Sequence, residues 1–443
     1  DGVRGVGGFG VSMFRGVWVS WFRGMGVSRF RGIEVARFRG MGLIGLISLI
    51  GLIGFQACGR GGYSRGEMEG DSIVRGGLDS VQAEHDISLD ARAWSDSIMD
   101  TMTLEELAGQ LIMPAVYANA DAAELRLLRE YATDCHVGGV VLLKGSVEGA
   151  CNIADTLRAI LKAPPFIAID AEWGLAMRLE GTPEFPRNGR ISQEADETMM
   201  FDYGYEVARE CREIGINMVL GPVLDVLPER RRSSGIGSRS FGNDAERVAN
   251  LGVAYAKGLE SGGVMSVAKH FPGHGSADAD SHKRLPIVSK SREALEQKDL
   301  LPFREYIGNG LSGIMTGHLN VPTLDENEVP VTVSEKILKD LVRKEMGFGG
   351  LIVTDALNMA GAGGYSAADA IMAGADIVLA PADTEKEVGS IIEAVRSGRF
   401  SVAELRDRVG MVLFFKYMNA KEDLGSGNIG ETAEAERINK LLR

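Results

Sequence analysis

Eight short apolar runs, each separated from the next by a stretch of helical character, constrain the fold of this 443-residue chain more than any other feature. The runs occupy residues 111–117, 138–143, 165–170, 216–226, 264–271, 311–318, 350–357 and 375–381. Buried strands that alternate with helices form parallel sheets, because a helix carries the chain back to the start of the next parallel strand. Eight such units predict an α/β fold with a single (β/α)8 TIM-type barrel. A doubly wound open sheet is the alternative.

Capping signals set the limits of the predicted helices. The first helix signal contains Thr103 and Glu106 at the spacing of a capping box. Several later helical segments end in glycine just before the next apolar run, as helix C-caps do. We therefore place the predicted barrel domain at residues 89–425 and assign residues 426–443 to a C-terminal tail.

The first 57 residues do not fit the predicted barrel. Phe-Arg-Gly recurs every eight residues, at 14–16, 22–24, 30–32 and 38–40. An apolar run then follows from residue 41, with the length of a signal-peptide core and too short for a membrane span. Because this run leads to Cys58, it resembles a bacterial lipoprotein signal. We predict a low-complexity repeat plus a signal/lipoprotein segment at 1–57, lipidation at Cys58, and a Gly- and Ser-rich linker at 58–88.

A lipidated Cys58 would attach the protein to a membrane through an N-terminal lipid anchor. The expected location is the bacterial cell envelope, as a periplasmic-side or outer-membrane lipoprotein, and secretion is the alternative. The formal net charge of −13 argues against nucleic acid as a partner, because such binding requires cations that neutralise phosphates. No G-x-G-x-x-G motif opens a helix after the first predicted strand, and no G-x-x-x-x-G-K-[S/T] motif is present, so the common nucleotide-binding functions lose support.

Ionisable residues follow the apolar runs at one end only. In a barrel of parallel strands the carboxyl ends meet at one face, and active sites lie there. The predicted strands therefore point to a polar site on the barrel axis. The residues at these strand ends are Asp170, Glu172, Asp225, Arg239, Lys269, His270, His318 and Asp355.

The stretch KHFPGHGSADADSH, at residues 269–282, holds three of the six histidines of the chain. His270 and His274 lie four residues apart, a spacing that suits a zinc pair on a helix. Pro272 and Gly273 stand between them and break any helix there. A catalytic metal is therefore disfavoured.

Two residues near the end of the same stretch suit proton transfer. Asp280 lies two residues before His282, and a carboxylate beside an imidazole stabilises its charged form and fixes its tautomer. An exposed, Asp-rich turn is the alternative for this pair when it is considered in isolation.

KHFPGHG followed by DSH, with four further motifs, resembles family 3 glycoside hydrolases, and within them the β-N-acetylglucosaminidase branch. The further motifs are IDAEWGLAMRL at 169–179, GSRSFG at 237–242, GFGGLIVTDALNM at 347–359 and AIMAGADIVLAP at 370–381. The resemblance covers nearly the whole predicted barrel, and the barrel fold of that family agrees with the strand count.

The resemblance implies a retaining β-N-acetylhexosaminidase that works by double displacement on GlcNAc-containing muropeptides or chitooligosaccharides. It implies that Asp355 is the nucleophile and that His282, paired with Asp280, is the general acid/base. No cofactor or metal is implied. The implied sugar-binding residues are Asp170, Arg178, Arg239, Lys269 and His270.

Other functions remain open on sequence grounds. A β-N-acetylglucosaminide phosphorylase and a broad-specificity family 3 β-glycosidase are the enzymatic alternatives, and a noncatalytic sugar-binding lipoprotein is the alternative of another class. Two positions depart from the usual family pattern. Trp173 stands where the family has glycine, and is expected either to form an apolar wall for a sugar or to pack. His274 is followed by Gly-Ser-Ala instead of Gly-Asp-Thr, and we expect it to be structural.

Overall fold

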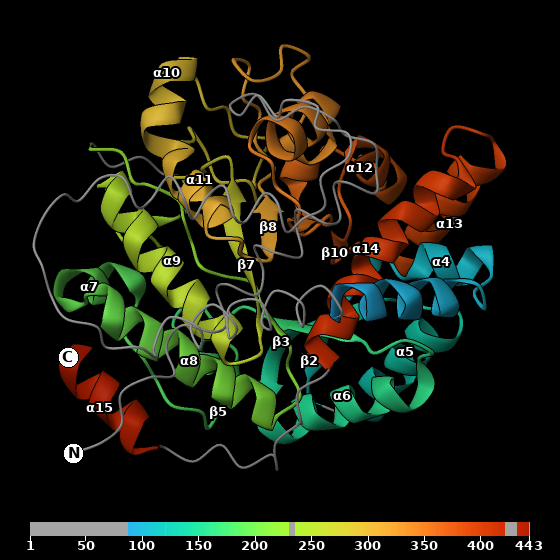
Figure 1. The fold of residues 1–443 in the computed structure, drawn as a ribbon, viewed down its shortest axis with the longest axis horizontal. Coiled ribbons are helices and arrows are strands. Elements are labelled where there is room, and N and C mark those ends of the chain that lie inside the picture. The colour runs from blue at the N-terminus through green and yellow to red at the C-terminus, as the bar shows by residue number, and fades with distance from the viewer. Residues whose placement is uncertain (1–86, 120, 230–234, 421–431, 443) are drawn as a thin grey trace, which may run out of the picture. The chain divides into compact units, whose positions relative to one another are not determined.

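A curled sheet of parallel strands organises the protein (Figure 1). The computed structural model describes residues 87–119, 121–229, 235–420 and 432–442. The strands are β1 (Ile112–Met113), β2 (Ala115–Ala118), β3 (Gly139–Ser146), β4 (Phe166–Ile169), β5 (Leu179–Glu180), β6 (Met218–Val219), β7 (Met265–Phe271), β8 (Gly313–Thr316), β9 (Leu351–Thr354) and β10 (Val378–Leu379). Every one of the eight predicted runs contributes a strand, and every strand pair is parallel.

The order of the strands follows the chain. One sheet runs β2-β3-β4-β6-β7-β8-β9, and β1 pairs with β10. Backbone hydrogen bonds also connect the two ends of this series. Thr354 at the end of β9 donates to Ile377 beside β10 over 2.9 Å, and Val378 in β10 donates to Leu111 beside β1 over 2.8 Å. The prediction of an α/β fold with a parallel sheet is confirmed.

Helices alternate with the strands and lie around them (Figure 1). They comprise residues 87–99, α4 (Leu104–Gly109), α5 (Ala122–Thr133), α6 (Val147–Ile160), α7 (Asn188–Glu194), α8 (Glu197–Glu213), α9 (Ala245–Ser261), α10 (Arg292–Ala294), α11 (Leu301–Gly308), α12 (Ala367–Ala373), α13 (Thr384–Arg396), α14 (Val402–Ala420) and α15 (Ala433–Leu442). A π-helical stretch (Lys336–Glu345) occupies the place of the helix expected between β8 and β9. Among the described residues no helix has the length and apolar character needed to cross a membrane.

Local sequence signals explain where helices begin. Thr103 and Glu106 form the predicted capping box: the Thr103 hydroxyl accepts from the Glu106 N–H over 3.2 Å, and the Glu106 carboxylate accepts from the Thr103 N–H over 2.9 Å. Asp244 caps α9 with its side chain alone, which accepts from the backbone N–H groups of Glu246 and Arg247. Each cap satisfies backbone donors that a helix start leaves free.

Two local features differ from the sequence reading. The first apolar run is divided into β1 and β2 at Pro114, which has no N–H to donate to a neighbouring strand. Within the segment assigned to a C-terminal tail, α15 forms a helix. It is bound to α8 by an Arg437–Asp202 ion pair of 2.7 Å. The predicted repeat, signal segment, lipidated Cys58 and nearly all of the linker lie outside the described residues.

Two ionisable side chains of the site are buried in the core, at the carboxyl end of β7. All seven residues of β7 are buried, and they include Lys269 and His270 at its carboxyl end. A buried charge is very unfavourable unless an opposite charge or several hydrogen bonds stabilise it. The partners of these two side chains therefore determine what the site can do.

Candidate active site

A cavity of about 320 Å³ opens at the carboxyl ends of the strands. All eight residues predicted for catalysis and sugar binding line it: Asp170, Arg178, Arg239, Lys269, His270, Asp280, His282 and Asp355. Glu172, His274 and Ser281 also line it. The chain therefore brings together side chains that lie as much as 185 residues apart in the sequence, from Asp170 to Asp355.

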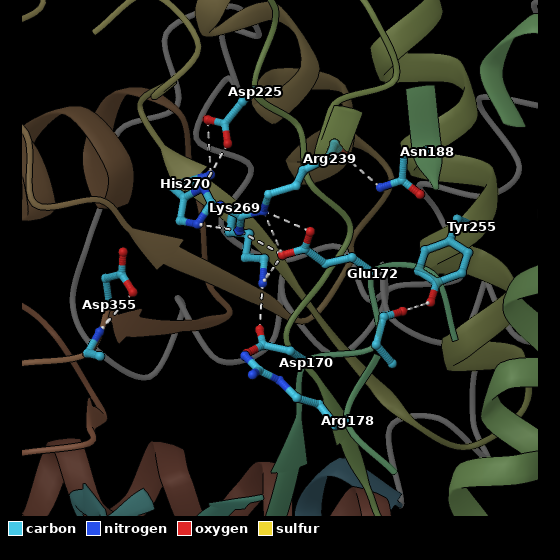
Figure 2. A network of polar contacts seen from close by, with 12 residues as sticks. Asp170, Glu172, Arg178, Asn188, Asp225, Arg239, Tyr255, Lys269, His270 and Asp355 are labelled. Atoms are coloured by element: carbon cyan, nitrogen blue, oxygen red, sulfur yellow. Dashed lines mark hydrogen bonds and ion pairs between the residues drawn. The ribbon is translucent and has the colours of Figure 1, made fainter. Parts of the chain in front are cut away.

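Lys269 lies at the centre of a charged group in this cavity and is only 2% exposed (Figure 2). Its Nζ donates to Asp170 Oδ1 over 2.7 Å and lies 2.8 Å from Glu172 Oε1. Burial alone would lower the pKa of Lys269, but the two carboxylates raise it above its ordinary value. Lys269 is therefore a fixed cation.

Two arginines complete the group on either side. Arg178 donates to Asp170 Oδ2, and Arg239 binds both oxygens of Glu172, over 2.7 Å from Nη2 and 2.9 Å from Nε. Burial alone would raise the pKa of Asp170 and of Glu172, but Lys269 and the arginines lower both. These five residues, the Lys269 cluster, thus hold three cations and two carboxylate anions in a preset arrangement.

Side chains outside the cavity fix the backbone that carries the cluster (Figure 2). Asn188 at the start of α7 donates from Nδ2 to the carbonyl of Arg239 over 2.8 Å. The Tyr255 hydroxyl on α9 donates to the carbonyl of Ala171 over 3.0 Å. The loops after β4 and β6 are therefore tied to helices on the outside of the sheet.

Asp225 is a site residue that the sequence analysis placed at a strand end without giving it a role. It is fully buried, and its Oδ2 lies 2.7 Å from His270 Nδ1. Its Oδ1 accepts from the backbone N–H of His274 over 2.6 Å. Burial alone would raise the pKa of Asp225, but His270, with help from His274, lowers it to about 2. An anionic Asp225 places the Nδ1 proton of His270 toward itself, which leaves Nε2 facing Arg239 at 3.4 Å and the cavity.

Asp355 lies directly after β9, apart from the cluster (Figure 2), and lines the same cavity. Its Oδ1 accepts from the N–H of Ala356 over 2.8 Å. Burial alone would raise the pKa of Asp355, but the charges of His270 and His318 lower it. His318 is buried, and its Nε2 lies 3.0 Å from the carbonyl oxygen of Ala356, so the residue that follows Asp355 is held in place.

Asp280 and His282 form a pair at the exposed edge of the cavity. His282 Nδ1 lies 2.9 Å from Asp280 Oδ1, and the His282 backbone N–H donates to the same oxygen over 3.0 Å. The side chain of His282 is 69% exposed and that of Asp280 is 28% exposed. Burial alone would raise the pKa of Asp280, but hydrogen bonds from the backbone and ring of His282 lower it.

His270 and His274, whose spacing would suit a zinc pair on a helix, have other partners, and His270 Nδ1 faces Asp225. Among the described residues there is no group of three His, Cys, Asp or Glu that could hold a metal ion. His274 is 3% exposed and its Nε2 lies 3.1 Å from Ser281 Oγ. Trp173 packs under the guanidinium of Arg187, 4.6 Å from the ring centre, and does not line the cavity. Trp173 therefore packs against a neighbouring side chain and does not form an apolar wall of the cavity.

Comparison with known proteins agrees with this geometry. Residues 103–414 match the glycosyl hydrolase family 3 N terminal domain. The chain belongs to glycoside hydrolase family 3. The predicted family is therefore confirmed, and this family 3 chain is a glycosidase.

The relatives of this family 3 chain include several named β-hexosaminidases. That of Nitrosomonas eutropha is 37% identical over 258 residues, which cover 55% of this chain and 73% of the relative. That of Neisseria meningitidis serogroup A is 37% identical over 279 residues, which cover 59% and 76%. A family 3 β-N-acetylglucosaminidase structure from Paenibacillus sp. str. FPU-7 aligns with a TM-score of 0.70 at 32% identity, and the alignment covers 77% of this chain and 68% of that one.

Proposed function

We propose that this glycosidase is a retaining β-N-acetylhexosaminidase, with Asp355 as nucleophile and His282, paired with Asp280, as general acid/base. One observation carries the proposal: a single cavity is lined by an anionic carboxylate, by an exposed Asp-His pair and by the Lys269 cluster. Relatives named β-hexosaminidase support the substrate class. The proposed substrates are GlcNAc-containing muropeptides or chitooligosaccharides.

In the first step a carboxylate oxygen of Asp355 attacks the anomeric carbon, and the bond to the leaving oxygen breaks. Oδ1 is already bonded to the Ala356 N–H, which leaves Oδ2 for the attack. The lowered pKa of Asp355 supports this role, because only the anion is a nucleophile.

His282 supplies the proton that the leaving oxygen needs. Its Nδ1 faces Asp280, so Nε2 is the nitrogen that would deliver the proton. In the second step the neutral ring takes a proton from water, and the resulting hydroxide equivalent displaces Asp355 from the sugar. The bond to Asp280 holds the His282 ring in one orientation through both steps.

The Lys269 cluster and His270 are proposed to bind the sugar. Arg178 lines the cavity with its guanidinium held by Asp170, and it is proposed to donate to a sugar hydroxyl. His270 lines the cavity, and because its Nδ1 proton faces Asp225, its Nε2 is proposed to accept from a sugar hydroxyl. Polar groups that are held in place before binding add specificity, because their alignment costs little when the ligand arrives.

We propose further that the curled sheet is a complete (β/α)8 barrel. The bonds from β9 to β10 and from β10 to β1 support closure. Cys58 as a lipid anchor in a bacterial cell envelope also stays a proposal. Metabolic labelling with a fatty-acid analogue would test it, because Cys58→Ser should remove the label.

A rate comparison tests the catalytic roles. On 4-nitrophenyl β-N-acetylglucosaminide we expect Asp355→Ala to lose roughly a thousandfold or more in rate. His282→Ala should lose roughly a hundredfold or more on diacetylchitobiose and much less on the nitrophenyl substrate, whose leaving group needs no proton. Lys283→Ala, an exposed neighbour, is the matched control. Retention of most activity by Asp355→Ala would refute the nucleophile assignment.

The same assay separates the alternative functions. Aryl β-GlcNAc, β-GalNAc and β-Glc are compared with and without phosphate. Release of a sugar 1-phosphate would identify a phosphorylase, and equal rates on the glucoside would identify a broad-specificity β-glycosidase. Binding of chitobiose without turnover of any of these substrates would identify a noncatalytic sugar-binding protein.

A further inference from the structure

Ser281 lies between Asp280 and His282 in the sequence, but it is buried, whereas His282 is exposed. It is 3% exposed, whereas the side chain of its neighbour His282 is 69% exposed. Ser281 lies within a loop, so contacts with other segments must bury it. Its side chain contacts His274, and its backbone carbonyl contacts Gly361.

The Ser281 side chain is tied to the base of the site. Its Oγ lies 3.1 Å from Nε2 of the buried His274. The backbone N–H of His274 donates in turn to Asp225 Oδ1 over 2.6 Å, and the other oxygen of Asp225 binds His270. Ser281 therefore connects the exposed loop to the fixed residues at the end of β7.

The Ser281 backbone is tied to the loop that carries the nucleophile. Its carbonyl accepts from the N–H of Gly361 over 2.9 Å, six residues after Asp355. A Cβ atom at Gly361 would lie 2.8 Å from that carbonyl oxygen and 3.1 Å from His318 Cβ. Only glycine allows these two loops to approach so closely.

We propose that Ser281 is the positioning residue that fixes the Asp280–His282 pair relative to Asp355; this rests on the proposed function. The proton donor and the nucleophile lie on separate loops, after β7 and after β9, and Ser281 bonds to both supports. Without its hydroxyl, the pair keeps its own internal bond and the bond from Gly361 to the Ser281 carbonyl, but it loses the bond to His274 that holds this loop at the end of β7, and so its position relative to the nucleophile is no longer fixed from both sides. Proton transfer depends steeply on the relative position of the donor and the reacting atoms, because a displacement of about 1 Å can reduce a rate by about a hundredfold.

A positioning role predicts a loss that depends on the leaving group. Ser281→Ala should reduce kcat on diacetylchitobiose on the order of tenfold and change kcat on the nitrophenyl substrate little. KM should stay close to that of the unaltered protein, since Ser281 donates nothing to the sugar. Gly361→Ala should give the same pattern, because it displaces the same carbonyl from the other side.

Combination with His282→Ala makes the test decisive. If Ser281 acts through His282, Ser281→Ala should have no further effect on chitobiose turnover in the His282→Ala background. Ser276→Ala is the matched control, because Ser276 is a buried serine of the same loop whose Oγ binds Asp299 instead. It should leave the ratio of the two substrate rates unchanged.

Three outcomes would overturn the inference. Ser281→Ala could reduce both substrates equally, it could reduce activity further in the His282→Ala background, or it could change neither rate. Failure of the proposed function looks different: His282→Ala itself would then lose equally on both substrates. Urea unfolding of each variant shows whether a loss of activity reflects a loss of folded protein. Lowered stability would reduce the rates on both substrates alike and would not change the dependence on the leaving group.

Discussion

Glu210 on α8 is expected to destabilise the protein at neutral pH, so that Glu210→Gln should be a stabilising substitution. Glu210 is fully buried, and neither of its carboxylate oxygens has a hydrogen-bond partner among the described residues. Burial, with a smaller effect of the nearby Glu206, raises the pKa of Glu210 from 4.5 to about 8. The folded protein therefore holds this proton much more tightly than the unfolded chain does.

The sign and the size of the effect follow from this difference. Between pH 4.5 and pH 8 the unfolded chain has released the proton and the folded protein has not, so the free energy of unfolding falls by about 1.4 kcal/mol per pH unit. At pH 7 the accumulated loss is about 3 kcal/mol. Glutamine has no proton to lose, so Glu210→Gln should be more stable by that amount at pH 7 and nearly equal to the unaltered protein at pH 4.5.

Urea unfolding at pH 5, 6, 7 and 8 measures the difference directly. Glu206→Gln is the matched control one turn earlier, because Glu206 is bound by Arg209 over 2.8 Å and by Thr432 over 2.7 Å. That variant should lose stability. A stability difference between Glu210→Gln and the unaltered protein that stays constant from pH 5 to pH 8 would refute the reasoning, as would a less stable variant at pH 8.

Two further predictions concern the buried anions of the cavity. Asp225 has a pKa of about 2, against 3.8 in a free chain. It therefore contributes about 2 kcal/mol to the free energy of unfolding above pH 4, and this contribution is lost as the pH falls from about 4 to 2. The stability difference between Asp225→Asn and the unaltered protein should shrink from pH 6 to pH 3, and a constant difference would contradict this. Glu172→Gln should lower the free energy of unfolding by about 3 kcal/mol, because Lys269 and Arg239 lose a shared anion; an unchanged melting temperature would exclude that role.

The sequence predicted the strands well because apolar runs and helix caps are local signals. The capping box at Thr103 needs only residues three apart, and every apolar run contains a strand. The division of the first run at Pro114 follows from a proline within the run, which interrupts the strand there. The helix α15 was not predicted, and the contacts that join its region to α8, Arg437 with Asp202 and Thr432 with Glu206, link residues far apart in the sequence, which no local pattern reveals.

The site was predicted from family motifs and from residue type at strand ends, and its members do line one cavity. Their pairing was not predictable, because it depends on which loops meet in space. Asp225 had the same placement as Asp170, yet nothing in the sequence showed that it lies behind His270. The partner of Trp173 is Arg187, which comes from a later loop.

The balance of charge in the cavity bears on how a substrate finds it. The Lys269 cluster has one cation more than it has carboxylates, whereas Asp225 behind His270 and Asp355 are both anions, so these buried groups together carry only a small net negative charge. A net charge this small contributes little long-range steering, and a glycan that is itself uncharged does not respond to it. A neutral glycan would meet this glycosidase by diffusion and be recognised only at contact, by the direction of individual donors and acceptors. Capture of such a ligand should then be as fast in concentrated salt as in dilute buffer.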